Sequence, residues 1–268
     1  MTDYRAAYEA ATGHPVPPEA AGLDVLFAKI SAGEPLPPRG QQAVDAGLTA
    51  HSLNDAKEAP AVFHYYQWVL AHYFADGQLN ELSAKLIGMA FTAANIFQTE
   101  LPQPLTLNPW QIAAMANYPL ATTKAVVVEN NGVFVLLHTL HPTWPLIDQG
   151  GNDFQKAYVA LMQQLVARGL RLAYLGDLDS EGIRIADTLL GALPRDSGPD
   201  FLSLQTPQRV LQWITDRGRV DAGRTGDRRI SDPTLQTELA TIRFSGKFVE
   251  QEQLLSEYEG LIGDWLKD

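Results

Sequence analysis

Between residues 125 and 193, short apolar runs alternate with stretches of helix length, and this alternation constrains the fold more than any other feature. The runs Ala125–Val128, Pro145–Ile147 and Leu170–Leu175 have the length and composition of short buried strands. Segments with helical spacing of apolar residues follow them, such as Gly182–Leu193. Because strands and helices alternate at these lengths, we expect an α/β fold with a parallel sheet flanked by helices.

The N-terminal part of the chain has a different pattern. Six prolines lie between Pro15 and Pro38, so helices in this stretch must be short. Apolar residues then recur at intervals of three and four in Pro60–Asp76 and in Leu79–Thr99, which predicts two amphipathic helices. The proline-rich stretch 101–110 lacks periodicity and makes a natural boundary.

These patterns predict three parts. A mainly helical N-terminal domain is expected over residues 1–115, an α/β domain over 120–230, and a C-terminal helical extension over 231–268. Within the extension, Phe248–Lys267 has amphipathic spacing. Between these parts, Arg209–Arg229 mixes arginines with glycines and aspartates, which predicts a mobile and locally basic loop.

Composition and charge exclude several classes of protein. With no cysteine, the chain has no disulfide, no thiolate zinc site and no cysteine nucleophile. Its net charge of −11 argues against a protein that coats nucleic acid through bulk electrostatics. The start of the sequence lacks a basic segment followed by an apolar one, and no apolar run reaches membrane-spanning length. We therefore expect a soluble, cytoplasmic protein that has no contact with a membrane.

Acidic residues gather at the ends of two predicted strands. Asp177, Asp179 and Glu181 stand within five residues directly after the third strand. Glu129 follows the strand predicted over Ala125–Val128. Since ligands gather at the carboxyl ends of parallel strands, we expect these side chains to form one site. Repulsion among clustered carboxylates destabilises a fold unless a cation, a proton or a basic partner offsets it.

Three other interpretations of the acidic segment stay open. An EF-hand loop matches its acid and glycine positions but has Thr188 where that loop needs glutamate. A haloacid-dehalogenase-type phosphatase also uses two aspartates after a strand, but Glu181 stands where threonine or valine is usual. The third is a solvated turn, in which the dipole of the next helix stabilises Asp179 and Glu181.

Three blocks of sequence carry a family resemblance. VVVENNGVF (126–134), PLIDQGGND (145–153) and YLGDLDSEGIRI (174–185) resemble, in this order, the Toprim domain in the form found in topoisomerase VI and its meiotic relative. They are more similar still to the bacterial DUF2220 and DUF2399 families, which include the nuclease component (JetD) of Wadjet plasmid-defence systems. The resemblance covers roughly residues 120–195 and implies that the expected sheet is Toprim-like.

The resemblance also implies roles for the acids. By position, Asp177 and Asp179 would bind Mg²⁺ or Mn²⁺, and Glu129 would be a further ligand or an acid/base group. Glu181 either joins the metal site or stabilises the start of the helix. Carboxylate oxygens are the ligands that Mg²⁺ prefers, which agrees with this assignment. Asn130 stands where the topoisomerase relatives have lysine, and this difference favours the Wadjet and DUF2399 branch.

Other residues could extend the site. Gly182 has no side chain, so it permits a ligand to approach the backbone at the start of a helix. The N-terminus of a helix attracts phosphate. Glu250 and Glu252, in a segment similar to one near the end of the Wadjet nuclease, could complete the metal shell or belong to an exposed helix face. The basic segment could contact DNA phosphates or be an ordinary solvated loop. Its candidate DNA-binding residues are Arg217, Arg219, Arg224 and Arg228.

Two further pairs invite a catalytic interpretation. The adjacent Tyr65 and Tyr66 prompt comparison with the nucleophilic tyrosine in the winged-helix domain of topoisomerase VI, but the surrounding motif does not match. We therefore expect them in a hydrophobic core, in a domain for which the winged helix is one candidate form, and we expect water as the nucleophile. His138 and His141 could meet one metal, but without a third ligand we expect a structural or surface role.

The expected function is metal-dependent cleavage of a DNA phosphodiester bond. By resemblance, the partners would be DNA and an SMC-like ATPase with its accessory subunits, in plasmid or phage defence. The chain could also form a homodimer. Two rivals stay open: a non-catalytic Toprim-like module that only docks DNA or a partner, and a metal-dependent phosphatase that acts on a small phosphate ester.

Overall fold

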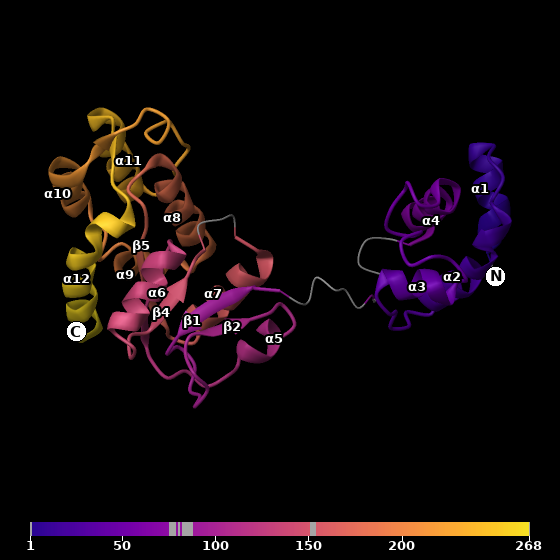
Figure 1. The fold of residues 1–268 in the computed structure, drawn as a ribbon, viewed down its shortest axis with the longest axis horizontal. Coiled ribbons are helices and arrows are strands. Elements are labelled where there is room, and N and C mark those ends of the chain that lie inside the picture. The colour runs from indigo at the N-terminus through magenta and orange to yellow at the C-terminus, as the bar shows by residue number, and fades with distance from the viewer. Residues whose placement is uncertain (1, 75–78, 80, 82–87, 151–153, 268) are drawn as a thin grey trace. The chain divides into compact units, whose positions relative to one another are not determined.

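The computed structural model describes residues 2–74, 79, 81, 88–150 and 154–267. The chain forms two compact units, Met1–Leu86 and Ile87–Asp268, and each has its own hydrophobic core (Figure 1). The sequence patterns placed the boundary at 115–120 instead. The difference arises because the strands that begin at Phe91 pair with the main sheet and not with the N-terminal helices.

The first unit is helical, and its helices share one hydrophobic core. Helix α4 begins with a proline at its first turn and buries Tyr65, Tyr66 and Val69, which confirms the helix predicted from Pro60 onward. Among its described residues the one β contact outside named strands is the bridge between Leu36 and Glu81, so no winged-helix hairpin is present there. The helices are α1 (Tyr4–Thr12), η1 (Pro18–Gly22), α2 (Leu23–Ser31), α3 (Arg39–Asp45) and α4 (Pro60–Tyr73).

The second unit is the α/β part of the chain. Its order begins β1 (Phe91–Ala94), β2 (Leu105–Leu107), α5 (Ile112–Met115), β3 (Lys124–Val128), α6 (Asn131–Leu140), β4 (Leu146–Asp148), α7 (Lys156–Ala167), β5 (Arg171–Leu175) and α8 (Ser180–Ala192). It continues with η3 (Arg195–Ser197), α9 (Gly198–Phe201), α10 (Pro207–Arg217), β6 (Arg219–Val220), α11 (Pro233–Ser245), β7 (Lys247–Phe248), η4 (Gln251–Leu254) and α12 (Leu255–Lys267). The alternation predicted between residues 125 and 193 is confirmed.

Five strands form a mixed sheet in the order β2-β1-β4-β3-β5. The strands β3, β4 and β5 are parallel, whereas β1 runs antiparallel to both of its neighbours. All residues of the interior strand β3 are buried, as expected for a strand covered on both faces. The sheet therefore combines the predicted parallel core with an antiparallel edge.

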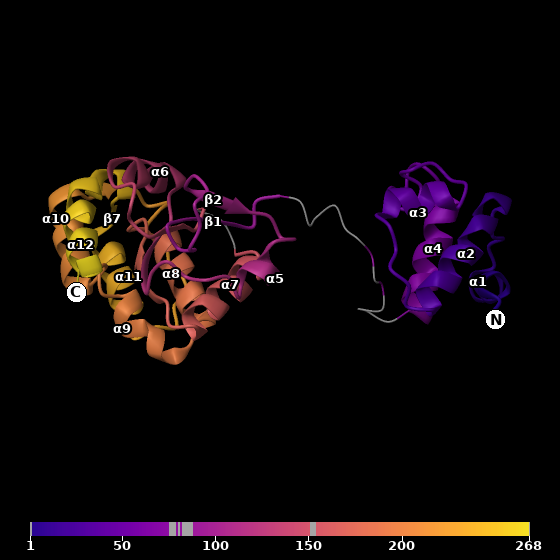
Figure 2. The ribbon, with the colours of Figure 1, turned by 90° about the horizontal axis from the view of Figure 1, so that it is seen from below.

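The two crossovers place helices on opposite faces of the sheet. From β3 the chain moves through α6 to β4, and it then returns across β3 through α7 to β5. Because such crossovers are right-handed, moves in opposite directions put α6 and α7 on opposite faces. Figure 2 shows α6 on one side of β1 and β2, with α7 and α8 on the other. The chain thus leaves β3 towards one face and leaves the adjacent β5 towards the other, which makes their carboxyl ends a topological switch point.

Two elements differ from the sequence predictions. The helix predicted over Leu79–Thr99 is wrong at Phe91–Ala94, which forms β1, while residues 80 and 82–87 lie outside the described part. The loop predicted over Arg209–Arg229 is wrong over its first part, where α10 forms. Thr206 caps this helix and a proline opens it, while Val210, Trp213 and Ile214 face the core.

The C-terminal helices belong to the core of the second unit and are not a separate extension. Leu239 and Ile242 of α11 and Tyr258 and Ile262 of α12 are buried in the same cluster as the sheet. The helix predicted over Phe248–Lys267 is present from Leu255, after a short 3₁₀ turn. None of the helices in the described ranges has the length and apolar character needed to cross a membrane.

Candidate active site

The acids that follow β3 and β5 meet at the switch point. Val128 and Leu175 are partners in the parallel ladder, and the N–H of Glu129 donates to the carbonyl of Leu175 over 3.1 Å. The ends of the two strands are thereby aligned, with Glu129 beside Asp177. This fulfils the expectation that these two acids share one edge of the sheet.

Glu129 is held in a buried position. Its Oε2 atom accepts hydrogen bonds from the Tyr174 hydroxyl and from the N–H of Asp177, both over 3.1 Å. Only 7% of the residue is exposed, and burial, with a smaller contribution from the nearby Asp177 charge, raises the pKa of the Glu129 carboxyl to about 7.

Asp177 is bound from two sides. Its Oδ1 atom accepts the N–H of Gln251 over 2.9 Å, and its Oδ2 atom accepts from Arg224 over 3.1 Å. Burial raises the pKa of the Asp177 carboxyl, the Gln251 N–H lowers it, and the neighbouring Asp179 raises it. Asp177 thus joins the end of β5 to the C-terminal segment of the chain.

Asp179 is the N-cap of α8. Its Oδ1 atom accepts the N–H groups of Glu181 and Gly182 over 2.9 and 2.7 Å, while its Oδ2 atom accepts from Arg224 over 2.7 Å. A Cβ atom at Gly182 would lie 2.1 Å from the carbonyl oxygen of Asp177. Glycine is needed here because the helix start approaches backbone, and the Gly182 N–H is already bound by the cap.

Arg224 connects the acids. Its Nε donates to Asp179, its Nη1 donates to Glu250 over 2.6 Å, and its Nη2 donates to Asp177. The guanidinium lies 4.1 Å from the centre of the Phe248 ring. The sequence had placed Arg224 among residues for DNA phosphate, whereas the structure directs it to three carboxylates of its own chain.

The segment after β7 forms a wall of the site. Leu178 and Val249 exchange two backbone hydrogen bonds, which brings the segment alongside the loop after β5. Asn130, the cap of α6, donates its N–H to Gln251 Oε1 and its side-chain amide to Glu252, both over 2.8 Å. Of the two roles left open for Glu250 and Glu252, a place beside the acids agrees with the contact of Glu250 with Arg224, whereas Glu252 binds Asn130.

Glu181 faces away from the other acids and towards arginines. Its Oε1 atom accepts from Arg184 over 2.8 Å and its Oε2 atom accepts from Arg228 over 3.3 Å. The hydrogen bond from Arg184 lowers the pKa of the Glu181 carboxyl, and Arg228 adds to this effect. These contacts favour a role at the start of α8 over contact with a metal.

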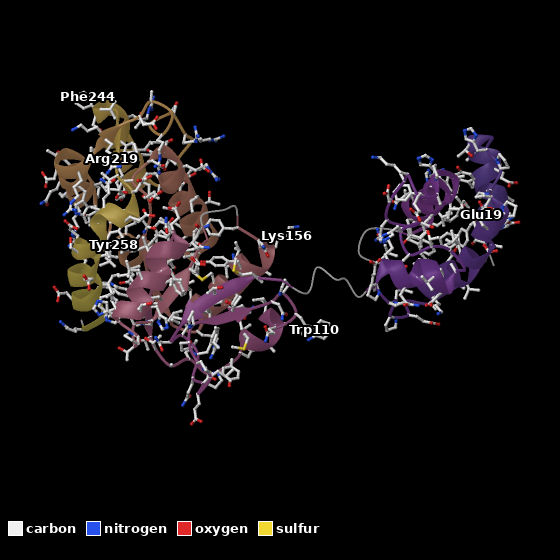
Figure 3. All side chains as sticks on the ribbon, viewed as in Figure 1. Glu19, Trp110, Lys156, Arg219, Phe244 and Tyr258 are labelled. Carbon is white, nitrogen blue, oxygen red and sulfur yellow. The ribbon has the colours of Figure 1, made fainter. Side chains whose placement is uncertain are left out.

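The remaining candidate arginines differ in their contacts. Arg217 donates to the carbonyl of Gln253 over 2.5 Å and pairs with Glu257, so it fastens α10 to the C-terminal part. Arg219, labelled in Figure 3, is exposed on β6. Arg217, Arg219 and Arg228 are exposed, whereas Arg224 is half-buried.

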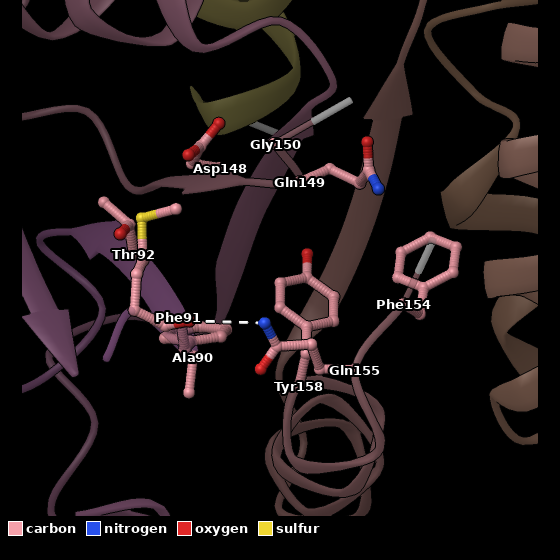
Figure 4. A pocket seen from close by; sticks show the side chains of 10 residues that line it. Ala90, Phe91, Thr92, Asp148, Gln149, Gly150, Phe154, Gln155 and Tyr158 are labelled. Carbon is pink, nitrogen blue, oxygen red and sulfur yellow. Dashed lines mark hydrogen bonds between the residues drawn. The ribbon is translucent and has the colours of Figure 1, made fainter. Parts of the chain in front are cut away.

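A further acid, the last residue of β4, was missed in the sequence analysis. Asp148 is buried, and burial raises the pKa of its carboxyl to about 6. It borders a cavity of about 80 Å³ that Tyr158 also lines. Among the described residues neither Asp148 Oδ1 nor the Tyr158 hydroxyl has a hydrogen-bond partner, and Figure 4 shows the hydroxyl directed towards the end of β4.

His141 and the two tyrosines singled out in the sequence have structural surroundings. His141 bonds to Glu259 over 2.7 Å and stacks on Trp144 with ring centres 3.7 Å apart. Tyr65 and Tyr66 are fully buried, and burial raises the pKa of the Tyr65 hydroxyl to about 12. These surroundings favour the core interpretation of the tyrosines over a role as nucleophile.

The acids have the chemistry of a divalent cation site. In the described ranges, no group of three histidine, aspartate or glutamate side chains is arranged to hold a metal. However, oxygens of Asp177, Asp179 and Glu250 already converge on one cationic group. Hard carboxylate oxygens that converge on a positive charge fit Mg²⁺ or Mn²⁺.

The fold and this site define an α/β protein with an acidic centre at the carboxyl ends of parallel strands. The model of the family described as "Protein of unknown function C-terminus (DUF2399)" matches residues 105–258, which is more than half of the chain. The chain therefore belongs to the DUF2399 family, which confirms that part of the resemblance. A search of curated proteins gives no match.

Proposed function

We propose that this protein is a metal-dependent, DNA-cleaving Toprim-type protein that serves as the nuclease component of a Wadjet-like plasmid or phage defence system. The observation that carries the proposal is the meeting of Glu129, Asp177 and Asp179 at the ends of adjacent parallel strands. Membership of the DUF2399 family and the resemblance of the three sequence blocks support it.

Asp177 and Asp179 are the proposed ligands of Mg²⁺ or Mn²⁺, with Glu250 beside them. When bound, the cation would activate a water molecule and neutralise charge on the attacked phosphate. The backbone N–H of Gln251 and the cap of α8 fix one oxygen of each aspartate, so the other oxygen of each is aimed at the shared point.

Glu129 is the proposed acid/base group. Tyr174 and the Asp177 N–H hold its Oε2 atom, so the carboxyl has a fixed orientation. A group with a pKa of about 7 can accept and return a proton near neutral pH, which suits general acid/base catalysis. Buried Tyr174 hydrogen-bonds to Glu129 and is a positioning residue that the sequence analysis missed.

DNA and an SMC-like ATPase with its accessory subunits are the proposed partners. Arg219 and Arg228 are the proposed phosphate contacts: both are exposed, and Arg228 lies beside Glu181 at the start of α8. Arg217 is bound to Glu257 and Arg224 to the acids of the site. With a net charge of −11, the chain has little bulk attraction for DNA, so delivery of DNA by a partner suits it.

The proposal is tested by nicking of supercoiled plasmid at low salt with Mg²⁺ or Mn²⁺. Cleavage should be abolished in Asp177→Asn and lowered by about 10²–10⁴ in Glu129→Gln, the usual range for a general acid or base. Asp264→Ala is the matched control, because Asp264 is an exposed acid on α12 that pairs only loosely with Lys267. Cleavage that persists in Asp177→Asn would contradict the proposal.

A non-catalytic docking module is the second candidate, and one observation favours it. Arg224 already offsets the acids with three ion pairs, so the cluster is stable without a metal. Calorimetry separates the candidates: Mn²⁺ binding that needs Asp177 supports the nuclease, and absence of binding supports the docking module. Hydrolysis of p-nitrophenyl phosphate, measured in parallel, would instead support the small-molecule phosphatase.

A further inference from the structure

The guanidinium of Arg224 occupies the point where the carboxylates converge. Its three nitrogens reach Asp177 Oδ2 at 3.1 Å, Asp179 Oδ2 at 2.7 Å and Glu250 Oε1 at 2.6 Å. A planar guanidinium is one of the few side-chain groups that can bond to several carboxylates at once. For Asp177 and Asp179 these are also the oxygens that no backbone N–H group binds, so they are the oxygens that a divalent cation would need.

The structure holds Arg224 in this position in two further ways. The backbone N–H of Ser180 donates to the Arg224 carbonyl over 2.9 Å, which fastens the segment to the first residue of α8. One face of the guanidinium covers the Phe248 ring at 4.1 Å. Backbone, ring and acids together therefore position the arginine over the site, and its side chain remains 28% exposed to solvent.

The charges do not cancel. Three carboxylates share one guanidinium in a partly buried place, so acidic groups outnumber the basic group at this point. The site therefore retains attraction for a divalent cation, but that cation must take oxygens that Arg224 holds.

We infer that Arg224 is the resident cation of the acidic site and competes directly with the divalent metal for Asp177, Asp179 and Glu250. This inference rests on the proposed function, which requires a metal at this site. It adds that a side chain of the site itself limits metal binding. The arginine keeps the acids paired without metal, so the site binds metal only when the guanidinium moves aside. Metal affinity in the free protein is therefore lower than the acids alone would give.

Calorimetric titration of the full-length protein with MnCl₂, in the absence of DNA, tests the inference. Arg224→Gln removes the competing charge and should bind Mn²⁺ roughly tenfold or more tightly than the wild type. The matched control is Arg243→Gln, because Arg243 pairs with Asp227 over 2.7 Å and contacts none of the three acids. This control should bind Mn²⁺ as the wild type does.

Thermal unfolding provides a second readout. Without metal, Arg224→Gln should melt at a lower temperature than the wild type because its carboxylates lose their counter-charge, and MnCl₂ should raise its melting temperature more than that of the wild type. If Arg224→Gln does not fold, Arg224→Lys replaces it. Lysine lacks the fork that bonds several acids, so this variant should also bind Mn²⁺ more tightly than the wild type.

Equal or weaker Mn²⁺ binding by the folded Arg224 variants would overturn the inference, as would binding that rises equally in Arg243→Gln. Plasmid cleavage decides the proposed function separately. If the wild type binds Mn²⁺ and Arg224→Gln binds it more tightly, the inference is supported even if neither protein cuts DNA.

Discussion

At the residue scale, glycine is required at position 182 because the carbonyl oxygen of Asp177 lies too close for a side chain. A Cβ atom there would lie 2.1 Å from the carbonyl oxygen of Asp177, whereas a Cβ at Gly191 of the same helix would meet nothing within 4 Å. Gly182→Ala should therefore lower the free energy of unfolding by about 1–3 kcal/mol or more, because backbone must move. Gly191→Ala should raise it by about 0.5–1 kcal/mol through helix propensity. Urea unfolding of both variants measures this, and equal stabilities would contradict the close approach.

Glu238 gives a prediction about pH. This α11 side chain is fully buried and accepts from Gln205 Nε2 over 3.1 Å, and burial raises the pKa of its carboxyl from 4.5 to about 8. Between these two values the folded state holds a proton that the unfolded state has lost. Stability should therefore fall as pH rises through this range, with a slope of about 1.4 kcal/mol per pH unit from this group.

Glu238→Gln removes the carboxyl group that binds the proton, so stability should fall less steeply with rising pH in this variant. The glutamine keeps an oxygen for Gln205, so the fold should be retained. Urea unfolding at several pH values between 5 and 8 measures the difference between variant and wild type, which should grow in favour of the variant as pH rises. Glu129 and Asp148 have raised pKa values of about 7 and 6 and keep part of the slope in both proteins. A difference that is constant with pH would contradict a raised pKa at Glu238.

Site residues were predictable from sequence where a strand ends. Glu129 and Asp177 follow apolar runs, and the same signal could have found Asp148, which comes directly after the run Pro145–Ile147. Arg224 is different because it lies far along the chain from Asp177, and its position depends on how the segment after β6 folds back over the site. Local sequence patterns do not show that this segment folds back over the site.

At the element scale, the start of α8 serves both stability and the site. Asp179→Ala removes the two cap hydrogen bonds and should lower the free energy of unfolding by about 0.5–2 kcal/mol. Asp179→Asn retains an oxygen for these N–H groups, so it should lose less stability while it still loses the charge that faces Arg224. Under the proposed function both variants should lose Mn²⁺ binding equally. Denaturant unfolding together with calorimetry separates the two effects, and equal destabilisation would show that the cap contributes nothing.

Elements with a periodic pattern of apolar residues were predictable from the sequence. Elements whose form depends on pairing with distant strands were not. Helix α4 and the strands β3 and β5 have signals within their own residues. The strand β1 is short, and its apolar residues match helical spacing equally well, so only its antiparallel pairing with β2 and β4 decides its form. For α10, the cap Thr206 and the following proline are helix-start signals in the sequence, but the arginines, glycines and aspartates of Arg209–Arg229 predicted a loop instead.

At the scale of the whole molecule, the division of the chain follows its two cores. The proline-rich stretch 101–110 suggested a boundary, but β2 lies within it and pairs with β1, so both strands complete the sheet edge. Tyr258 and Ile262 of α12 share the core with β3, so a C-terminal extension cannot be separated from the sheet. Sequence composition marks where helices break, whereas a domain boundary depends on which strands pair.

All of the candidate site lies in the second unit, and this leads to a prediction for a fragment. The fragment 88–268 retains the sheet, both layers of helices and the Arg224 cluster, and its core includes no residue of the first unit. A chain of this length can bury enough apolar surface to fold alone. It should unfold in a single cooperative transition and bind Mn²⁺ within a few-fold of the full chain.

The fragment also separates the chemistry from the capture of DNA. If 88–268 binds Mn²⁺ normally but cuts plasmid less than the full chain, the helical unit contributes to DNA binding or delivery and not to the acidic site. If both proteins cut equally, the acids and their strands suffice for the reaction. A fragment that folds cooperatively but fails to bind Mn²⁺, when the full chain binds it, would show that the site needs residues of the first unit and would contradict the division drawn from the two cores.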